Sequence, residues 1–241
     1  MLREPVHQQL ISLGLKTAAS TLDRLSFSDD QIEALSLLLE AEILERMSKS
    51  QAQRLKHAKL VHQSAHPADI DLRTSRNLSK NIWQKLISLN WLKQHQHLLL
   101  IGPTGIGKSY LACALAKAAI AQKTSVRYLR MPRLEEELAL ARGQGKLSQW
   151  LKNMSKIPLL ILDDFGLIPM PQNDQPLLLE LIEDRQQRGS LIVTSQLPIK
   201  LWHGQFSDPT LADAILDRLV HNAEKVELKG ESMRKSHAEL E

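Results

Sequence analysis

A glycine-rich segment limits the folds open to this 241-residue chain: Gly102-Pro-Thr-Gly-Ile-Gly-Lys-Ser109. It fits the pattern G-x-x-x-x-G-K-[ST] and follows the apolar run Leu98–Ile101, which has the length of a buried strand. An Ala- and Leu-rich stretch typical of a helix comes directly after it. Because glycine has no Cβ atom, the backbone of such a segment curls and points its N–H groups at phosphate oxygens. The sequence therefore predicts a phosphate-binding loop between a strand and a helix of an α/β sheet.

The side chains of this loop have predictable roles. Lys108 is expected to place its ammonium against the β- and γ-phosphates of a nucleoside triphosphate, and Ser109 to offer its hydroxyl to Mg²⁺. The positive end of the following helix adds to the attraction. The alternative, a glycine-rich turn without nucleotide, leaves the flanking strand and helix unexplained. The predicted cofactor-binding residues are Gly102, Pro103, Thr104, Gly105, Ile106, Gly107, Lys108, Ser109 and Tyr110.

A second part of the site is predicted where the apolar run Leu159–Leu162 ends in two carboxylates, Asp163 and Asp164. Open α/β sheets bind ligands at the carboxyl ends of their strands. Asp163 is expected to hold Mg²⁺, and Asp164 to act as the general base on the attacking water. Asp164 is one methylene shorter than Glu, so its reach to that water is less secure. The alternative is that the two Asp side chains only cap the next turn.

A third part is predicted at the end of the apolar run Leu191–Thr194. Thr194, Ser195 and Gln196 are candidates to touch the γ-phosphate or to orient water, and the sequence does not choose among them. Of these three candidates, Ser195 is the one that we include in the predicted catalytic set, with Lys108 and Asp164. A plain turn is an equally good interpretation.

The chain is predicted to hold a helical N-terminal domain at 1–66 and an α/β domain at 67–241. Ile32, Leu35, Leu39 and Ile43 follow helical spacing, and Ser28 with Gln31 forms a predicted capping box. A linker is expected near Pro67, followed by a helix at 76–94. Beyond it, strands alternate with helices, which predicts a parallel sheet covered on both faces. The expected strands are 98–101, 126–129, 159–162, 191–194 and 225–228, and the expected helices are 107–121, 133–142, 146–154, 175–188 and 209–222.

Positive charge gathers between residues 46 and 97, where ten basic and two acidic side chains give a net charge of +8 in a chain of net +4. Such asymmetry favours a surface that faces a polyanion, because neutralising phosphates releases condensed counterions. A solvated, salt-bridged helix face is the alternative. Arg54, Lys56 and Lys59 are the predicted DNA-binding residues.

The composition excludes several other classes of protein. A single Cys excludes a disulfide framework and a Cys-rich zinc site, and suits a reducing compartment. No apolar run approaches the roughly 20 residues that span a bilayer, and the N-terminus does not resemble a signal peptide. We therefore expect a cytoplasmic location and no membrane partner.

The C-terminal region carries a more specific signal, in two runs that lie close together. They are Asp208-Pro-Thr-Leu-Ala-Asp-Ala-Ile-Leu-Asp-Arg218-Leu-Val-His-Asn-Ala and Val226-Glu-Leu-Lys-Gly-Glu-Ser-Met-Arg234-Lys. Both closely resemble the C-terminal signature of IstB-like ATP-binding proteins, the transposition helpers encoded by a class of bacterial insertion sequences. The resemblance extends more weakly over the helical N-terminus, and it also covers the phosphate loop, Leu111–Leu115, Ser125–Arg130, Leu160–Leu167 and Val193–Pro198.

This resemblance implies an AAA+ P-loop ATPase, close to DnaC-type helicase loaders, that hydrolyses ATP with Mg²⁺. It implies self-assembly on double-stranded DNA and delivery of that DNA to a cognate transposase. Arg218 would be the arginine finger that reaches a neighbouring subunit's γ-phosphate; the alternative is an intrachain partner for Asp213 or Asp217. Arg234 would be a second nucleotide sensor, and Arg185 and Arg188 are expected to line a subunit interface or a DNA channel.

The sequence departs from the pattern of related ATPases in having Asp at position 164 where many carry Glu, which predicts slow hydrolysis. A replicative helicase loader of the same fold is the alternative function, and a monomeric small-molecule kinase is a third. The number of subunits, a ring or a helical assembly, the DNA sequence preference and the mobile element stay open.

Overall fold

The computed structural model describes residues 3–73 and 76–233, which form two compact units that divide after Gln53. In the first unit, α1 (Arg3–Ser12) and α2 (Lys16–Leu22) pack with the start of the long helix α3 (Asp29–Ala58). The four apolar residues that follow helical spacing lie in this small core, with Ile32 and Leu39 buried and Leu35 and Ile43 packed against them.

The start of α3 is capped as predicted. The backbone N–H of Ser28 donates to Oε1 of Gln31 at 2.9 Å, and the backbone N–H of Gln31 donates to Oγ of Ser28 at 3.3 Å. The two reciprocal bonds satisfy backbone donors that the first helical turn leaves without partners.

The second unit is built on a five-stranded sheet in the order β2-β3-β4-β1-β5, with every neighbouring pair parallel. This confirms the predicted parallel α/β sheet. The strands are β1 (His97–Ile101), β2 (Val126–Arg130), β3 (Leu159–Asp163), β4 (Ser190–Ser195) and β5 (Ala223–Glu227). The phosphate loop follows the fourth strand in this spatial order, so β4 and β5 flank its base.

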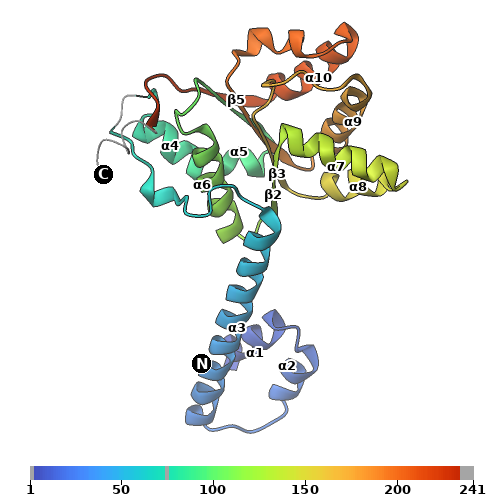
Figure 1. Ribbon diagram of the computed structural model, residues 1–241. Coiled ribbons are helices and arrows are strands. Elements are labelled where there is room, and N and C mark those ends of the chain that lie inside the picture. Colours follow the sequence, from blue (N-terminus) through green and yellow to red (C-terminus); the bar gives the residue numbers. More distant parts are fainter. Residues whose placement is uncertain (1–2, 74–75, 234–241) are drawn as a thin grey trace. The chain divides into compact units, whose positions relative to one another are not determined.

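Helices cover both faces of the sheet, as Figure 1 shows. Alternate residues of β1 point to opposite faces, since Leu98 and Leu100 lie in one core cluster and Leu99 and Ile101 in the other. On the first face lie α4 (Lys80–Ile87), α5 (Asn90–Lys93) and α6 (Lys108–Ala121). On the other lie α7 (Met131–Gly143), α8 (Leu147–Ser155), α9 (Gln175–Arg185) and α10 (Pro209–His221).

Short 3₁₀ turns complete the second unit: Pro67–Asp69, Gln172–Asp174, Ile199–Leu201 and His203–Gln205. Residues 54–66, which we expected in the helical N-terminal domain, contribute Ala58, Leu60 and Ala65 to the core around α6. Among the helices of residues 3–73 and 76–233, none combines the length and the apolar character that crossing a membrane requires.

Candidate functional site

The glycine-rich loop links the end of β1 to the start of α6, as predicted. Gly105 and Gly107 have φ angles of +77° and +95°, in the left-handed region that favours glycine. A Cβ atom on Gly105 would lie 2.0 Å from Oγ of Ser232, and one on Gly107 would lie 2.9 Å from Nη1 of Arg76. The backbone conformation therefore favours glycine at both positions, and a side chain at either one would have to displace Ser232 or Arg76.

Lys108 is held by the loop itself. Its side chain is 6 % exposed, and its Nζ donates to the backbone carbonyls of Gly102 at 2.7 Å and Pro103 at 2.8 Å. Burial lowers the pKa of this ammonium, and the nearby Asp163 and Asp164 oppose that effect. The ammonium thus lies inside the loop, where phosphate oxygens would replace the two carbonyls as acceptors.

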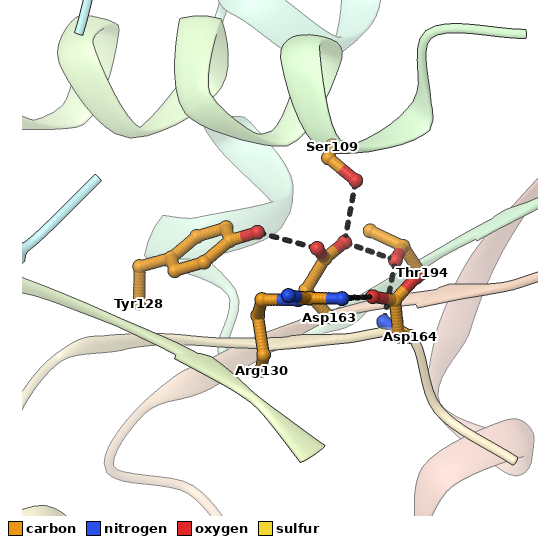
Figure 2. Close-up of polar contacts among 6 residues, drawn as sticks. All are labelled: Ser109, Tyr128, Arg130, Asp163, Asp164 and Thr194. Atoms are coloured by element: carbon orange, nitrogen blue, oxygen red, sulfur yellow. Dashed lines mark hydrogen bonds and ion pairs between the residues drawn. The ribbon is translucent and has the colours of Figure 1, made fainter. Parts of the chain in front are cut away.

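Asp163, at the end of β3, is surrounded by hydroxyl groups (Figure 2). Its Oδ1 accepts from Oγ of Ser109 at 2.8 Å and from Oγ1 of Thr194, and its Oδ2 accepts from the hydroxyl of Tyr128. The side chain is buried, with 2 % of the residue exposed. The two predicted magnesium ligands, Ser109 and Asp163, are therefore brought together from positions 54 residues apart.

The donor set fits Mg²⁺. A serine hydroxyl and a carboxylate are the hard oxygen donors that this ion takes in proteins, with the rest of its octahedron supplied by water and phosphates. Because Ser109 donates its proton to Asp163, the lone pairs of its Oγ remain free for a metal ion.

Asp164 adopts a φ angle of +63° directly after β3. Its backbone N–H donates to Oγ1 of Thr194 at 3.2 Å, and its Oδ2 accepts from the guanidinium of Arg130 at 2.8 and 3.1 Å. The hydrogen bond to Asp164 raises the pKa of Arg130. The predicted general base is thus engaged in an ion pair within its own chain.

The three candidates at the end of β4 have different surroundings. Thr194 contacts both acidic residues, through its hydroxyl to Asp163 and through the backbone N–H of Asp164. Ser195 is fully buried, and its Oγ donates to the carbonyl of Phe165 and accepts from the N–H of Leu197. Gln196 is half-buried. The arrangement places the hydroxyl of Thr194, not that of Ser195, against the carboxylate of Asp163.

Three residues of the site were missed from the sequence. Tyr128 and Arg130 stand two positions apart on β2, so they share one face of the sheet, and β2 lies next to β3. Arg76 is 4 % exposed and donates to the carbonyls of Ile106 and Asp71 at 3.3 and 2.7 Å. Burial lowers the pKa of Arg76. The period-two spacing of Tyr128 and Arg130 was the available signal for those two residues. Nothing in the sequence distinguished Arg76 from the other basic residues between positions 46 and 97.

Residues after β5 pass along the loop. The N–H of Lys229 donates to the carbonyl of Arg76 at 3.2 Å, and the N–H of Met233 donates to the carbonyl of Gly105 at 2.9 Å. Arg234, the predicted second sensor, lies outside the described residues. Arg76, which precedes β1, and the segment that follows β5 therefore both contact the loop.

Arg218, the predicted arginine finger, lies on α10 and pairs with Glu183 of α9 at 2.7 Å. It also donates to the carbonyl of Ala214 at 2.9 Å, and its side chain is 29 % exposed. Its intrachain partner is therefore Glu183, and Asp213 instead approaches His203 at 3.4 Å.

The prediction that Arg185 lines an interface or a channel is wrong. Its side chain is fully buried and donates to the carbonyls of Met154, Ile157, Pro158 and Ser190. Burial lowers its pKa to about 10. Arg185 thus ties the end of α8 to the start of β4, whereas Arg188 is exposed.

The predicted DNA-binding side chains lie at the end of α3 and just after it. Lys56 and Lys59 are exposed and Arg54 is half-buried. No ion pair within residues 3–73 and 76–233 involves Arg54, Lys56 or Lys59. Their charges are therefore available to an anionic partner.

Comparison with known proteins gives matches along nearly the whole chain. Residues 8–240 match the family described as IstB-like ATP binding protein. The chain is 47 % identical over 240 residues to a putative insertion sequence ATP-binding protein, y4uH, of Sinorhizobium fredii, which covers 98 % of this chain and 96 % of that protein. It is 31 % identical over 202 residues to the IS21 putative ATP-binding protein of Pseudomonas aeruginosa, covering 84 % and 76 % of the two chains.

Two solved structures have a similar fold at low sequence identity. The crystal structure of DnaI superposes with a TM-score of 0.58 at 22 % identity, covering 68 % of this chain and 91 % of that one. The crystal structure of the DnaC helicase loader gives 0.57 at 20 % identity, covering 69 % and 98 %.

Proposed function

This chain belongs to the family of IstB-like ATP-binding proteins, and from that premise we propose that it is a DNA-binding helper of transposition. It is an AAA+ P-loop ATPase of insertion-sequence type. In this proposal it works in the cytoplasm, oligomerises on double-stranded target DNA and delivers that DNA to a cognate transposase. Its cofactors are ATP and Mg²⁺.

One observation carries the catalytic part of the proposal: Ser109 at the start of α6 donates to Asp163 at the end of β3, at 2.8 Å. Those side chains would hold Mg²⁺, which when bound supplies charge neutralisation for the β- and γ-phosphates. Lys108 would exchange the carbonyls of Gly102 and Pro103 for phosphate oxygens. Gly102–Tyr110 would bind the nucleotide through the loop backbone and the start of α6.

Water activation is assigned to Asp164, which accepts the water's proton once its carboxylate is free of Arg130. Thr194 is the residue of the β4 end that we assign to orienting water or the γ-phosphate, because its hydroxyl bonds both the carboxylate of Asp163 and the backbone N–H of Asp164. Ser195 then supports the turn after β4 through its two backbone hydrogen bonds.

Arg218 is assigned to a neighbouring subunit's nucleotide. In the free chain its guanidinium pairs with Glu183 on the surface, an ion pair that a phosphate can replace. A guanidinium supplied across an interface makes hydrolysis depend on assembly.

DNA binding is assigned to Arg54, Lys56 and Lys59, whose charges have no acidic partner within the described chain. Phosphate contacts of this kind position the protein on a duplex without reading its sequence.

Sedimentation with and without duplex DNA and a non-hydrolysable ATP analogue tests this function. We expect large assemblies only when both are present, whereas a monomer under all conditions contradicts the proposal and favours a small-molecule kinase. The helicase-loader alternative shares the fold. Capture of a purified transposase, but not of a purified replicative helicase, on the ATP-analogue complex would support the transposition helper over the loader.

A further inference from the structure

Tyr128 reaches the carboxylate of Asp163 from β2, a strand for which the sequence predicted no catalytic or metal-binding residue. It lies on β2, in register with Ile161 of β3, and its hydroxyl donates to Oδ2 of Asp163. The residue is 5 % exposed and its ring belongs to the core cluster that includes α6. Figure 2 shows the ring lying along the sheet with its hydroxyl directed at the carboxylate.

The two oxygens of Asp163 have different partners. Oδ1 accepts from Ser109 and Thr194, and Oδ2 accepts only from Tyr128 among the contacts within the described chain. The torsion that turns a carboxylate about its Cβ–Cγ bond is broad, so the side chain alone does not fix the orientation of the carboxylate plane relative to Ser109. The hydroxyl of Tyr128 supplies that restraint by holding Oδ2 on the β2 side.

We propose that Tyr128 is a positioning residue for Mg²⁺, acting through Asp163: by fixing Oδ2, it keeps Oδ1 turned toward Ser109 and the metal. This inference rests on the proposed ATPase function. Partners of metal-binding side chains typically change metal affinity by about 10- to 100-fold when they are removed. The competing view is that Tyr128 only fills the core, with a hydroxyl that happens to find an acceptor.

Replacing Tyr128 by Phe separates the two views, because it keeps the ring and removes only the hydroxyl. The measurement is the affinity of Mn²⁺, a paramagnetic substitute for Mg²⁺, for the protein–AMPPNP complex, from the spectrum of free Mn²⁺. We expect Tyr128→Phe to weaken Mn²⁺ binding about tenfold. Binding of AMPPNP in EDTA should stay within about twofold of the unmodified protein, since the loop and Lys108 are untouched.

Ser190→Ala is the matched control. It removes a fully buried hydroxyl at the start of β4, whose Oγ has no hydrogen-bond partner among the described residues. It should leave the Mn²⁺ affinity unchanged. Equal Mn²⁺ affinities for Tyr128→Phe and the unmodified protein would overturn the proposal.

A second comparison holds even if Tyr128→Phe loosens the core. In an Asp163→Ala background the same Phe substitution should have no further effect on Mn²⁺ affinity, because its route of action is gone. An equal loss in both backgrounds would assign Tyr128 to packing alone. If the unmodified protein showed no nucleotide-dependent Mn²⁺ binding at all, the ATPase function itself would fail, and this inference with it.

Discussion

Arg130 donates two hydrogen bonds to a single oxygen of Asp164, from Nη2 at 2.8 Å and from Nε at 3.1 Å. The acidic side chain is 17 % exposed and the arginine side chain 54 % exposed, so the pair is open to water on the arginine side. The two bonds from the guanidinium use both lone pairs of Oδ2 and leave Oδ1 as the oxygen that can accept a proton from water. The unassembled chain therefore holds one of the two oxygens of its predicted base in an ion pair.

We expect Arg130→Gln to raise ATP turnover in the absence of DNA. Exposed ion pairs contribute about 0.2–1 kcal/mol, so freeing Asp164 should increase the rate by a factor of about 1.4 to 5. Arg133→Gln, which removes a neighbouring exposed arginine paired with Glu136 on α7, is the control and should not change the rate. A slower Arg130→Gln protein would mean that Arg130 assists the reaction instead of restraining it.

Lys108→Ala should abolish nucleotide binding while leaving the protein folded. The substitution removes a buried charge whose acceptors are loop carbonyls, so the unliganded protein loses little. Nucleotide at one hundred times its Kd stabilises a protein by about 2.7 kcal/mol, which raises Tm by about 5–10 °C for a chain of this size. Thermal unfolding should show this rise in the unmodified protein and in Lys117→Ala, a control at a half-buried lysine further along α6, but not in Lys108→Ala.

The Gly105–Ser232 contact predicts an interaction between two substitutions. Gly105→Ala forces a side chain into a φ of +77°, at a cost of about 1–2 kcal/mol, and also brings Cβ against Oγ of Ser232. Ser232→Gly removes the second effect and leaves the first. Measured by urea unfolding, the double variant should therefore lose less free energy of unfolding than the sum of the losses in the two single variants. Simple additivity would mean that Ser232 moves aside freely.

Local patterns predicted much of the fold because they depend on near neighbours. The strand expected at 159–162 is observed at Leu159–Asp163, and the strand expected at 126–129 at Val126–Arg130. The helix expected at 76–94 is instead broken at Leu89, whose φ is +57°. Leu89 is 1 % exposed, and no local rule places a leucine in the left-handed region, so here tertiary packing overrides propensity.

A part of the site was predictable only where one segment contains both the reactive side chains and the strand or helix that positions them. The loop and the two Asp residues meet that condition. Tyr128 and Arg130 bond those carboxylates only because β2 lies beside β3. The order of strands in a sheet cannot be read from the sequence of any single segment. Arg218 shows the same limit: spacing on its own helix left only Asp213 and Asp217 to consider, while Glu183 comes from another helix.

His97 predicts a dependence of stability on pH. Burial, with Arg185 nearby, lowers the pKa of His97 to about 4, and its Nδ1 accepts from the N–H of Leu191 at 3.2 Å. In the unfolded chain His97 binds a proton below about pH 6.5, whereas in the folded state it does so only near pH 4. The contribution of neutral His97 to the free energy of unfolding is therefore complete above pH 6.5 and is lost as the pH falls toward 4. The full loss is on the order of 3 kcal/mol.

His97→Asn should flatten the stability profile between pH 4 and 6.5, because an amide oxygen accepts the same bond without titrating. The free energy of unfolding, measured in urea at several pH values, reports the slope. His57→Asn, at an exposed position on α3, is the control that should keep the slope of the unmodified protein. An unchanged slope in His97→Asn would assign the pH dependence to other groups.

Removing the charges of Arg54, Lys56 and Lys59 should weaken DNA binding equally for all sequences. Each phosphate contact adds about 0.9 to the slope of log K against log salt, so replacing all three residues with Gln should lower that slope by up to about 3. Duplex binding at several salt concentrations, with the ATP analogue present, measures it. The control replaces Lys146, Lys152 and Lys156, three exposed lysines at or beside α8, which changes the net charge by the same amount. If both triple variants lose slope equally, the duplex responds to net charge alone, and the end of α3 is not its contact surface.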